Sequence, residues 1–329
     1  MQSFAYERAS TLAQAIGAAA KPGTAVIAGG TELLNWMKDG IAAPRRLVDL
    51  NRVPGLDGVT ADAHGLRIGA LARMSDLAEH PAIRRDYPAI SQALLQSASA
   101  QIRTMASIGG NLMQRTRCPY FRAEVELPCN RRRPGSGCAA LAGEDRSAAI
   151  FGWTEHCIAT HPSDVAVALA ALDAVLHVDG PGGPRAIPVT EFHRLPDDPS
   201  VPETVLEPGE LVTAIEVPAS AAARRSHYLK LRERASYEFA LVSAAVGLDL
   251  DGDVIREARI ALGGVAAKPW RLRDAEEALR GMASADEPAL RRALDAGFAE
   301  ARPRRGNGFK VELAKRAVIR ALQIAGGAA

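Results

Sequence analysis

Long hydrophobic runs and aromatic residues are scarce in this sequence. None of its 329 residues lies in a stretch of about 18 uninterrupted apolar residues, the length that a membrane-spanning helix needs. Residues 1–20 also lack the basic segment and the continuous apolar segment of a secretory signal peptide. We therefore expect no export or membrane signal in the chain, which leaves its compartment open between cytoplasm and periplasm.

Net charge and common nucleotide-binding motifs are also lacking. The formal net charge is +2, so neither nucleic acid nor a membrane surface is expected as the main partner. The glycine pairs match neither the dinucleotide motif G-x-G-x-x-G nor the motif G-x-x-x-x-G-K, which argues against a Rossmann fold or a P-loop. At 47% apolar and 24% charged residues, the composition is that of a globular protein long enough for two or three domains.

The spacing of apolar residues predicts short strands and helices along the chain. We expect strands at residues 24–28, 46–50, 66–70, 174–178, 211–217, 226–232, 241–250 and 254–262. We expect helices at residues 32–37, 75–80, 89–97, 163–171, 272–280, 287–301 and 309–324, with Ser163 as an N-cap. Asp251, Gly252 and Asp253 predict a hairpin turn, and the proline-rich residues 181–208 indicate a change of domain.

Two glycine pairs, Gly29-Gly30 and Gly109-Gly110, follow or precede apolar segments. Adjacent glycines let consecutive backbone amides approach one ligand, and such amides form a concavity suited to a pyrophosphate. A tight turn without a ligand is the alternative for each pair.

All four cysteines, Cys118, Cys129, Cys138 and Cys157, fall within one forty-residue stretch that is rich in Arg, Pro and Gly. Two disulfides, a zinc site and an iron-sulfur cluster are the alternatives. Two disulfides would add little to a chain of this size. The short Cys-x-x-Cys spacing typical of structural zinc is absent, whereas a four-iron cluster tolerates widely separated ligands. The nearby arginines either offset the charge of such a cluster or form a solvated surface loop.

Several segments resemble the FAD-binding subunit of molybdenum hydroxylases, the xanthine dehydrogenase and aldehyde oxidoreductase family. They are residues 26–34 (VIAGGTELL), 107–112 (SIGGNL) and 162–164 (PSD). The cysteine segment is similar to that of the subgroup with an added [4Fe-4S] cluster, as in bacterial periplasmic aldehyde oxidoreductase. The resemblance implies an α+β fold: a two-subdomain FAD-binding fold of the PCMH/vanillyl-alcohol-oxidase type, then an α/β domain like the C-terminal domain of carbon monoxide dehydrogenase flavoprotein. The implied domains are residues 1–55, residues 56–200 with a cluster loop at about 114–160, and residues 205–329.

The resemblance also implies site residues. The pyrophosphate loop would comprise Val26, Ile27, Ala28, Gly29, Gly30, Thr31, Glu32, Leu33 and Leu34, with Ser107, Gly110 and Asn111 in a second loop. Asp164 and Lys230 would lie at the flavin, and Val212 would make a backbone contact. By local pattern alone, Asp164 reads as a helix N-terminal carboxylate and Lys230 as a solvated strand lysine. Cys118, Cys129, Cys138 and Cys157 would bind the cluster, which leaves His156 and His161 with structural roles.

The implied function is electron relay in a heterotrimer. A large molybdenum-cofactor subunit would oxidise an aldehyde, and a small subunit with two [2Fe-2S] clusters would pass electrons through FAD to a terminal acceptor. In such enzymes export to the periplasm depends on a partner's signal. The alternatives are a flavin subunit of the 4-hydroxybenzoyl-CoA reductase or xanthine dehydrogenase type and, from another class, a zinc-stabilised module that binds an anionic partner through the arginine-rich loop.

Overall fold

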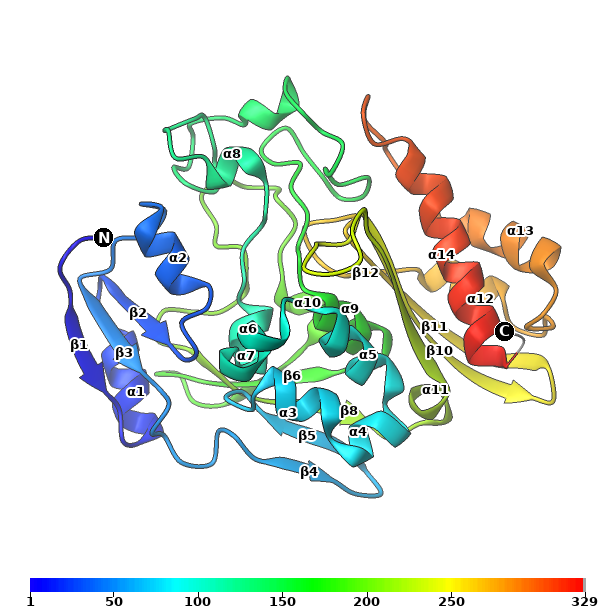
Figure 1. The fold of residues 1–329 in the computed structure, drawn as a ribbon, viewed down its shortest axis with the longest axis horizontal. Helices are drawn as coiled ribbons and strands as arrows, with labels where there is room; N and C mark the ends of the chain where they lie inside the picture. Colours follow the sequence, from blue (N-terminus) through cyan, green and yellow to red (C-terminus); the bar gives the residue numbers. More distant parts are fainter. Residues whose placement is uncertain (328–329) are drawn as a thin grey trace.

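The computed structural model describes residues 1–327, and these form three sheets that lie one after another across the molecule (Figure 1). The N-terminal sheet lies at one end, and the last helix lies at the other end (Figure 1). The mixed helix and strand architecture confirms the α+β fold class. None of the helices in residues 1–327 is both long and apolar enough to cross a membrane.

The N-terminal unit is a three-stranded parallel sheet in the order β1-β3-β2. Its strands are β1 (Ala5–Arg8), β2 (Thr24–Ile27) and β3 (Arg46–Asp49). Helix α1 (Leu12–Ala19) connects β1 to β2, which run parallel on the two sides of β3 and therefore need a crossover connection. Thr11 caps the N-terminus of α1. Helix α2 (Leu33–Lys38) follows β2 after the Gly29-Gly30 turn.

The middle unit is a five-stranded antiparallel sheet in the order β4-β5-β8-β6-β7. Its strands are β4 (Val59–Ala61), β5 (Gly65–Gly69), β6 (Val175–Asp179), β7 (Arg185–Pro188) and β8 (Leu211–Pro218). The helices of this segment are α3 (Met74–Glu79), α4 (Pro81–Asp86), α5 (Pro88–Gln96), α6 (Ala100–Met105), α7 (Ile108–Leu112), α9 (Asp164–Ala171) and α10 (Val189–Phe192). All eight residues of α9 are buried, and the helix contacts α5 on one side and the next sheet on another.

The C-terminal unit is a four-stranded antiparallel sheet in the order β12-β11-β10-β9. Its strands are β9 (Ser226–Leu231), β10 (Val242–Asp251), β11 (Val254–Gly263) and β12 (Trp270–Arg271). Helix α14 (Phe309–Gly326) packs on β9 and β10, beside α12 (Arg273–Ala278) and α13 (Glu287–Gly297); α11 (Ala221–Arg224) precedes β9. The predicted turn at Asp251, Gly252 and Asp253 joins β10 to β11, with Gly252 at φ +62°.

The cysteine segment contains little regular structure apart from α8 (Pro119–Arg122) and a short 3-10 helix (Ala139–Leu141). It projects beyond the middle unit, beside the N-terminal end of α14 (Figure 1). The C-terminal unit holds its distal part: Lys310 Nζ donates to the carbonyl oxygens of Ser147, Ala148 and Gly264 at 2.9, 3.0 and 2.8 Å. Lys310 is 1% exposed, so these three hydrogen bonds satisfy a buried amine.

The helices and strands expected from the sequence are all present within a few residues, and the structure adds several short ones, including β1, α1, β4 and β7. Strand β8 lies in the expected 205–329 segment, yet it pairs with β5 and β6 of the middle sheet. The division of the chain near residue 205 stays a prediction. Because β8 pairs with β5 and β6, the middle sheet is completed only by residues after that point.

Candidate functional site

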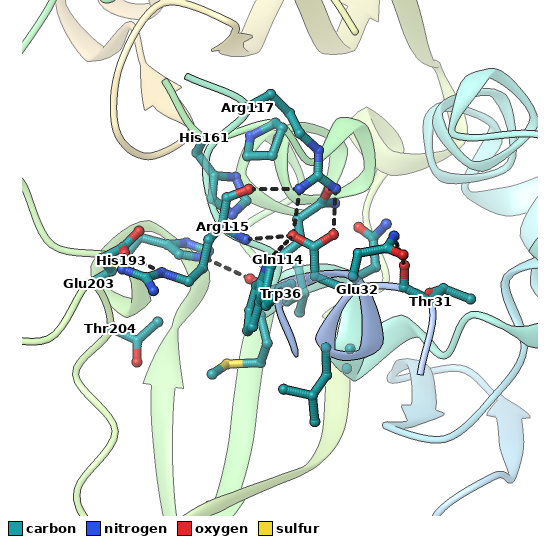
Figure 2. Close-up of a pocket in the computed structure, with 18 of the residues that line it drawn as sticks. Thr31, Glu32, Trp36, Gln114, Arg115, Arg117, His161, His193, Glu203 and Thr204 are labelled. Atoms are coloured by element: carbon teal, nitrogen blue, oxygen red, sulfur yellow. Dashed lines mark hydrogen bonds and ion pairs between the residues drawn. The ribbon is translucent and has the colours of Figure 1, made fainter. Parts of the chain in front are cut away.

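A cavity of about 990 Å³ lies among the three units and is lined by residues from each of them. The Gly29-Gly30 turn after β2 forms one wall, and α7 and the segment after it form another. Asp164 at the start of α9 and Lys230 in β9 contribute polar groups from the middle and C-terminal units. Figure 2 shows a part of a pocket where Glu32 and Trp36 face arginines of the cysteine segment. Such a concave, partly apolar site with a few converging polar groups is typical of a cofactor pocket.

The first glycine pair is required by the local geometry. A Cβ atom on Gly29 would lie 1.9 Å from the carbonyl oxygen of Met105, which is impossible without moving the backbone. Gly30 has φ +72°, in the left-handed region that favours glycine. The turn therefore packs against the end of α6 and brings its own backbone to the cavity wall.

The second predicted loop is fixed by side-chain hydrogen bonds. Ser107 Oγ accepts from the Gly110 N–H at 3.3 Å and caps α7. Asn111 Oδ1 accepts from the Ser163 hydroxyl at 2.5 Å, and the Ser163 oxygen accepts from the Ala166 N–H at 3.1 Å. Ser163 is therefore the N-cap that the sequence predicted, and Asn111 ties α7 to the start of α9.

Asp164 and Lys230 form a buried ion pair on the cavity wall. Lys230 Nζ lies 2.8 Å from Asp164 Oδ2 and donates to the Gln96 carbonyl oxygen at 3.0 Å. Tyr228 donates to Asp164 Oδ1 at 2.5 Å, and the Ser97 hydroxyl donates to Oδ2 at 3.1 Å. Burial raises the pKa of Asp164, and the charge of Lys230 with these hydrogen bonds opposes that shift.

The local sequence pattern alone predicts a helix N-terminal carboxylate at Asp164 and a solvated lysine at Lys230, and the structure agrees with the first only. Asp164 does occupy the first turn of a helix, as the local pattern indicated. The solvated alternative for Lys230 is wrong, because the residue is 7% exposed. Both side chains line the cavity, so neither is a plain surface charge.

Most of the predicted cofactor residues line this one cavity. They are Val26, Ile27, Ala28, Gly29, Gly30, Thr31, Glu32, Leu33, Ser107, Gly110, Asn111, Asp164, Val212 and Lys230. Leu34 is not among the lining residues; its side chain lies over Gly30, where its Cδ1 atom would be 3.1 Å from an added Cβ. Residues that are distant in sequence are thus brought together, and Leu34 supports the turn from behind.

The four cysteines also come together. All of them line a second cavity of about 10 Å³, and all four are free thiols. Cys129 and Cys138 pair as an isolated β-bridge. The disulfide alternative is therefore wrong for this structure. Within residues 1–327, no three His, Cys, Asp or Glu side chains form a group that could hold a metal ion. This finding supports neither the zinc alternative nor the [4Fe-4S] cluster, which stays a prediction.

The surroundings of the thiols combine burial with hydrogen-bond donors. Burial raises the pKa of Cys118 to about 11, and the backbone N–H groups of Phe121 and Tyr120 oppose the rise. Burial likewise raises the pKa of Cys138, against N–H groups that include those of Ala140 and Ile158. The Ala159 N–H lies 3.5 Å from Cys157 Sγ. These donors would stabilise thiolate ligands once a positive centre removed the protons.

Cys157 lines both cavities, together with Asn130, Arg131 and His156. The cysteine cavity and the large cavity are therefore neighbours that share a wall. This adjacency could not be read from the sequence, where Cys157 and the Gly29-Gly30 turn are far apart.

Two further polar features, a histidine pair at the large cavity and the tyrosine that binds Asp164, were not predicted. The rings of His161 and His193 lie 4.1 Å apart, and His193 Nε2 is 2.9 Å from the Leu112 carbonyl oxygen. Burial lowers the pKa of His193 to about 4, so its imidazole is neutral at pH 7. Tyr228, the partner of Asp164, stands two residues before Lys230 in β9, so strand alternation could have indicated it. Ser97 offers no comparable signal.

The paired-glycine cavity among the three units is that of a cofactor-binding protein, and comparison with known families identifies the flavin-binding class. Residues 2–220 match the family described as FAD binding domain in molybdopterin dehydrogenase. Residues 227–325 match the CO dehydrogenase flavoprotein C-terminal domain. The chain belongs to the FAD-binding subunits of the molybdenum hydroxylase family of oxidoreductases.

Individual relatives cover nearly the whole chain. The aldehyde oxidoreductase FAD-binding subunit PaoB of Escherichia coli (strain K12) is 48% identical over 325 residues, 98% of each chain. The carbon monoxide dehydrogenase medium chain of Hydrogenophaga pseudoflava is 27% identical, over 98% of this chain and 96% of that one. The solved structure of reconstituted CO dehydrogenase from Oligotropha carboxidovorans superposes with a TM-score of 0.77 at 26% identity and covers 100% of this chain and 99% of its counterpart.

Proposed function

We propose that this chain is the FAD and [4Fe-4S] subunit of a molybdenum-containing aldehyde oxidoreductase. The observation that carries the proposal is the shared wall between the glycine-lined cavity and the four-thiol cavity, at Cys157. The aldehyde substrate class is supported by the 48% identity with a subunit of that name over 98% of both chains.

The large cavity fits a dinucleotide cofactor. Its volume of about 990 Å³ lies in the range of cofactor and ligand sites. A side chain at Gly29 would collide with the Met105 carbonyl oxygen, against which the turn packs. In this proposal, Val26 to Leu33 and Ser107, Gly110 and Asn111 hold FAD through backbone and short side chains. Asp164, Lys230 and Val212 contact it from the opposite units. When bound, FAD would store two electrons and exchange them one at a time.

Lys230 and Asp164 have a defined task in this scheme. The ion pair places a positive group at the cavity wall while Asp164, Gln96 and the surrounding burial fix its position. A fixed charge of this kind shifts the balance between neutral and anionic forms of a neighbouring cofactor. Leu34 acts indirectly, by supporting the Gly30 turn.

The four thiols match the number and type of ligands that a [4Fe-4S] cluster needs. A [4Fe-4S] cluster is bound by four cysteine thiolates, one on each iron, so its ligands lie farther apart than the ligands of a single zinc. Cys118, Cys129, Cys138 and Cys157 are free, converge on one small cavity and are met by backbone N–H donors.

The proposed partners are a large molybdenum-cofactor subunit and a small subunit with two [2Fe-2S] clusters, in a heterotrimer. Family membership supports them, and the four cysteines of this chain are too few to supply those additional clusters. Electrons would enter from the small subunit and leave to a terminal acceptor. In the reductase alternative, the same residues would relay electrons toward molybdenum.

The test is anaerobic purification of the full chain with the subunits that copurify with it. We expect one FAD and about four irons in excess of those held by the small subunit, with aldehyde-dependent reduction of an artificial acceptor. A colourless chain with one zinc would overturn the proposal. Activity with a thioester of a hydroxybenzoic acid and none with aldehydes would move the complex to the reductase type.

A further inference from the structure

Glu32 lies in the Gly29-Gly30 turn segment, immediately before α2, but its carboxylate does not cap that helix. It accepts instead from Arg117 Nη1 and Nη2 at 2.5 and 2.7 Å and from Arg122 Nη2 at 2.6 Å. Trp36 Nε1 donates at 3.0 Å and the Arg115 backbone N–H at 3.3 Å. Figure 2 shows the Glu32 and Arg117 side chains facing each other. Five protein donors thus meet the carboxylate, four of them at Oε1 and one at Oε2.

Both guanidinium groups belong to the segment that carries the first cysteine. Arg117 directly precedes Cys118, and Arg122 ends α8. Arg122 Nε donates to the Thr116 carbonyl oxygen at 3.1 Å, and the Cys118 N–H donates to Thr116 Oγ1 at 3.1 Å. Glu32 therefore binds two arginines that, with Thr116, fix the backbone of Cys118.

These ion pairs are substantially removed from water. The side chains of Glu32, Arg117 and Arg122 are 16%, 27% and 18% exposed. Removal of the carboxylate would leave two poorly hydrated cations without their partner, which is more costly than loss of a surface pair. By contrast, the pair between Arg133 and Glu126 in the same loop is 72% and 70% exposed.

We propose that Glu32 is a positioning residue that couples the two cofactor sites. By joining the Gly29-Gly30 turn to the Cys118 segment, it makes retention of FAD depend on an assembled cysteine site, and retention of the cluster depend on an occupied flavin cavity. The proposal rests on the proposed FAD and cluster sites. Because coupling between two sites is reciprocal, each occupied site strengthens binding at the other by the same factor.

The test compares the affinity of the complex for FAD with the iron-sulfur cluster present and after its removal by a chelator. In the wild-type complex we expect removal to weaken FAD binding about tenfold, within the usual range of site coupling. Glu32→Gln keeps the size and one acceptor oxygen but removes the charge. It should lower the ratio between the FAD affinities with and without the cluster to about one. Glu126→Gln is the matched control and should keep the wild-type ratio.

Arg122→Lys provides a second variant if Glu32→Gln does not fold, because it retains the positive charge but loses the guanidinium geometry. It should also reduce the ratio. Equal FAD affinities of the wild type with and without its cluster would overturn the coupling, as would the wild-type ratio in both variants. A wild-type chain that never contains iron would instead overturn the cluster assignment, and with it the coupling, so the two failures are distinguishable.

Discussion

Lys230 in β9 and Asp164 at the start of α9 form an ion pair 2.8 Å long whose side chains are 1% and 6% exposed. The two residues belong to different units of the chain and meet at the wall of the large cavity. A pair this deeply buried costs desolvation energy, which is offset here by hydrogen bonds from Tyr228 and Ser97 and to the Gln96 carbonyl oxygen.

Lys230→Met should destabilise the chain and weaken its binding of FAD. The substitution keeps the length of the side chain but leaves Asp164 without its counter-charge, at a cost of about 3–5 kcal/mol in the free energy of unfolding. Urea denaturation and flavin titration measure the two effects. Lys268→Met is the control, because Lys268 donates to the Thr190 carbonyl oxygen outside the cavity. Unchanged flavin affinity and reduction potential in Lys230→Met would remove Lys230 from the cofactor site.

Gly29→Ala and Gly30→Val should abolish retention of FAD. The first adds an atom 1.9 Å from the Met105 carbonyl oxygen, and the second places a β-branched residue at φ +72°. Both displace the turn from the cavity wall. The flavin-to-protein ratio after purification is the measurement. Gly17→Ala is a matched control in α1, where an added Cβ meets no atom within 4 Å. Full occupancy in both turn variants would place the pyrophosphate elsewhere.

Cys129→Ser should lose about four irons per chain, because a hydroxyl is a poor substitute for a thiolate in a cluster. Iron analysis and the broad visible absorption of the purified complex report the loss. His156→Gln should keep its iron, since four thiolates complete the ligand set. Undiminished iron in Cys129→Ser would remove that residue from the ligands, and loss of iron in the histidine variant would add one.

The free energy of unfolding should fall as the pH decreases from about 6.5 to about 4. Burial lowers the pKa of His193 to about 4 in the folded chain, whereas an unfolded histidine titrates near 6.5. Between these values the unfolded chain binds a proton that folded His193 excludes, so this residue costs about 3 kcal/mol of stability on acidification. The buried His161, whose pKa burial also lowers, adds to the loss. Urea denaturation at several pH values gives the slope.

The matched pair for this slope is His193→Gln and His64→Gln. His64 is exposed and lies in the turn between β4 and β5. His193→Gln should reduce the dependence on pH without abolishing it, because His161 remains, while His64→Gln should leave it as in the wild type. If the free energy of unfolding of His193→Gln fell with pH as steeply as in the wild type, other groups would account for the loss of stability in acid.

Regular structure followed from local pattern, whereas the cavity did not. Apolar periodicity was enough to locate β10, β11 and α9 with the Ser163 cap, because these signals lie within a few residues of one another. The short strands β4 and β7 lack such a pattern and form because β5 and β6 offer them an edge. Pairing with neighbouring strands in the folded chain therefore determines these two strands, because their intrinsic strand propensity is not decisive.

The site residues divide in the same way. The sequence marked the glycine pairs and the four thiols by composition, and family resemblance supplied Asp164 and Lys230. Ser97, His193 and the shared wall at Cys157 arise from chain segments far apart, so no local spacing reveals them. Leu34 illustrates the opposite limit: the sequence motif includes it, but its side chain lies against Gly30 and does not line the cavity.

The late position of β8 in the chain has a consequence for biosynthesis. Gly65 pairs with Pro218, so the β4-β5 hairpin emerges from the ribosome with an unsatisfied edge until residues 211–218 follow. The cysteine segment is translated within that interval, and its distal anchor, Lys310, comes later still. If the chain holds the proposed cluster, its insertion would therefore follow synthesis of the whole polypeptide, and truncated nascent chains would present four thiols without a closed scaffold to protect them from oxidation.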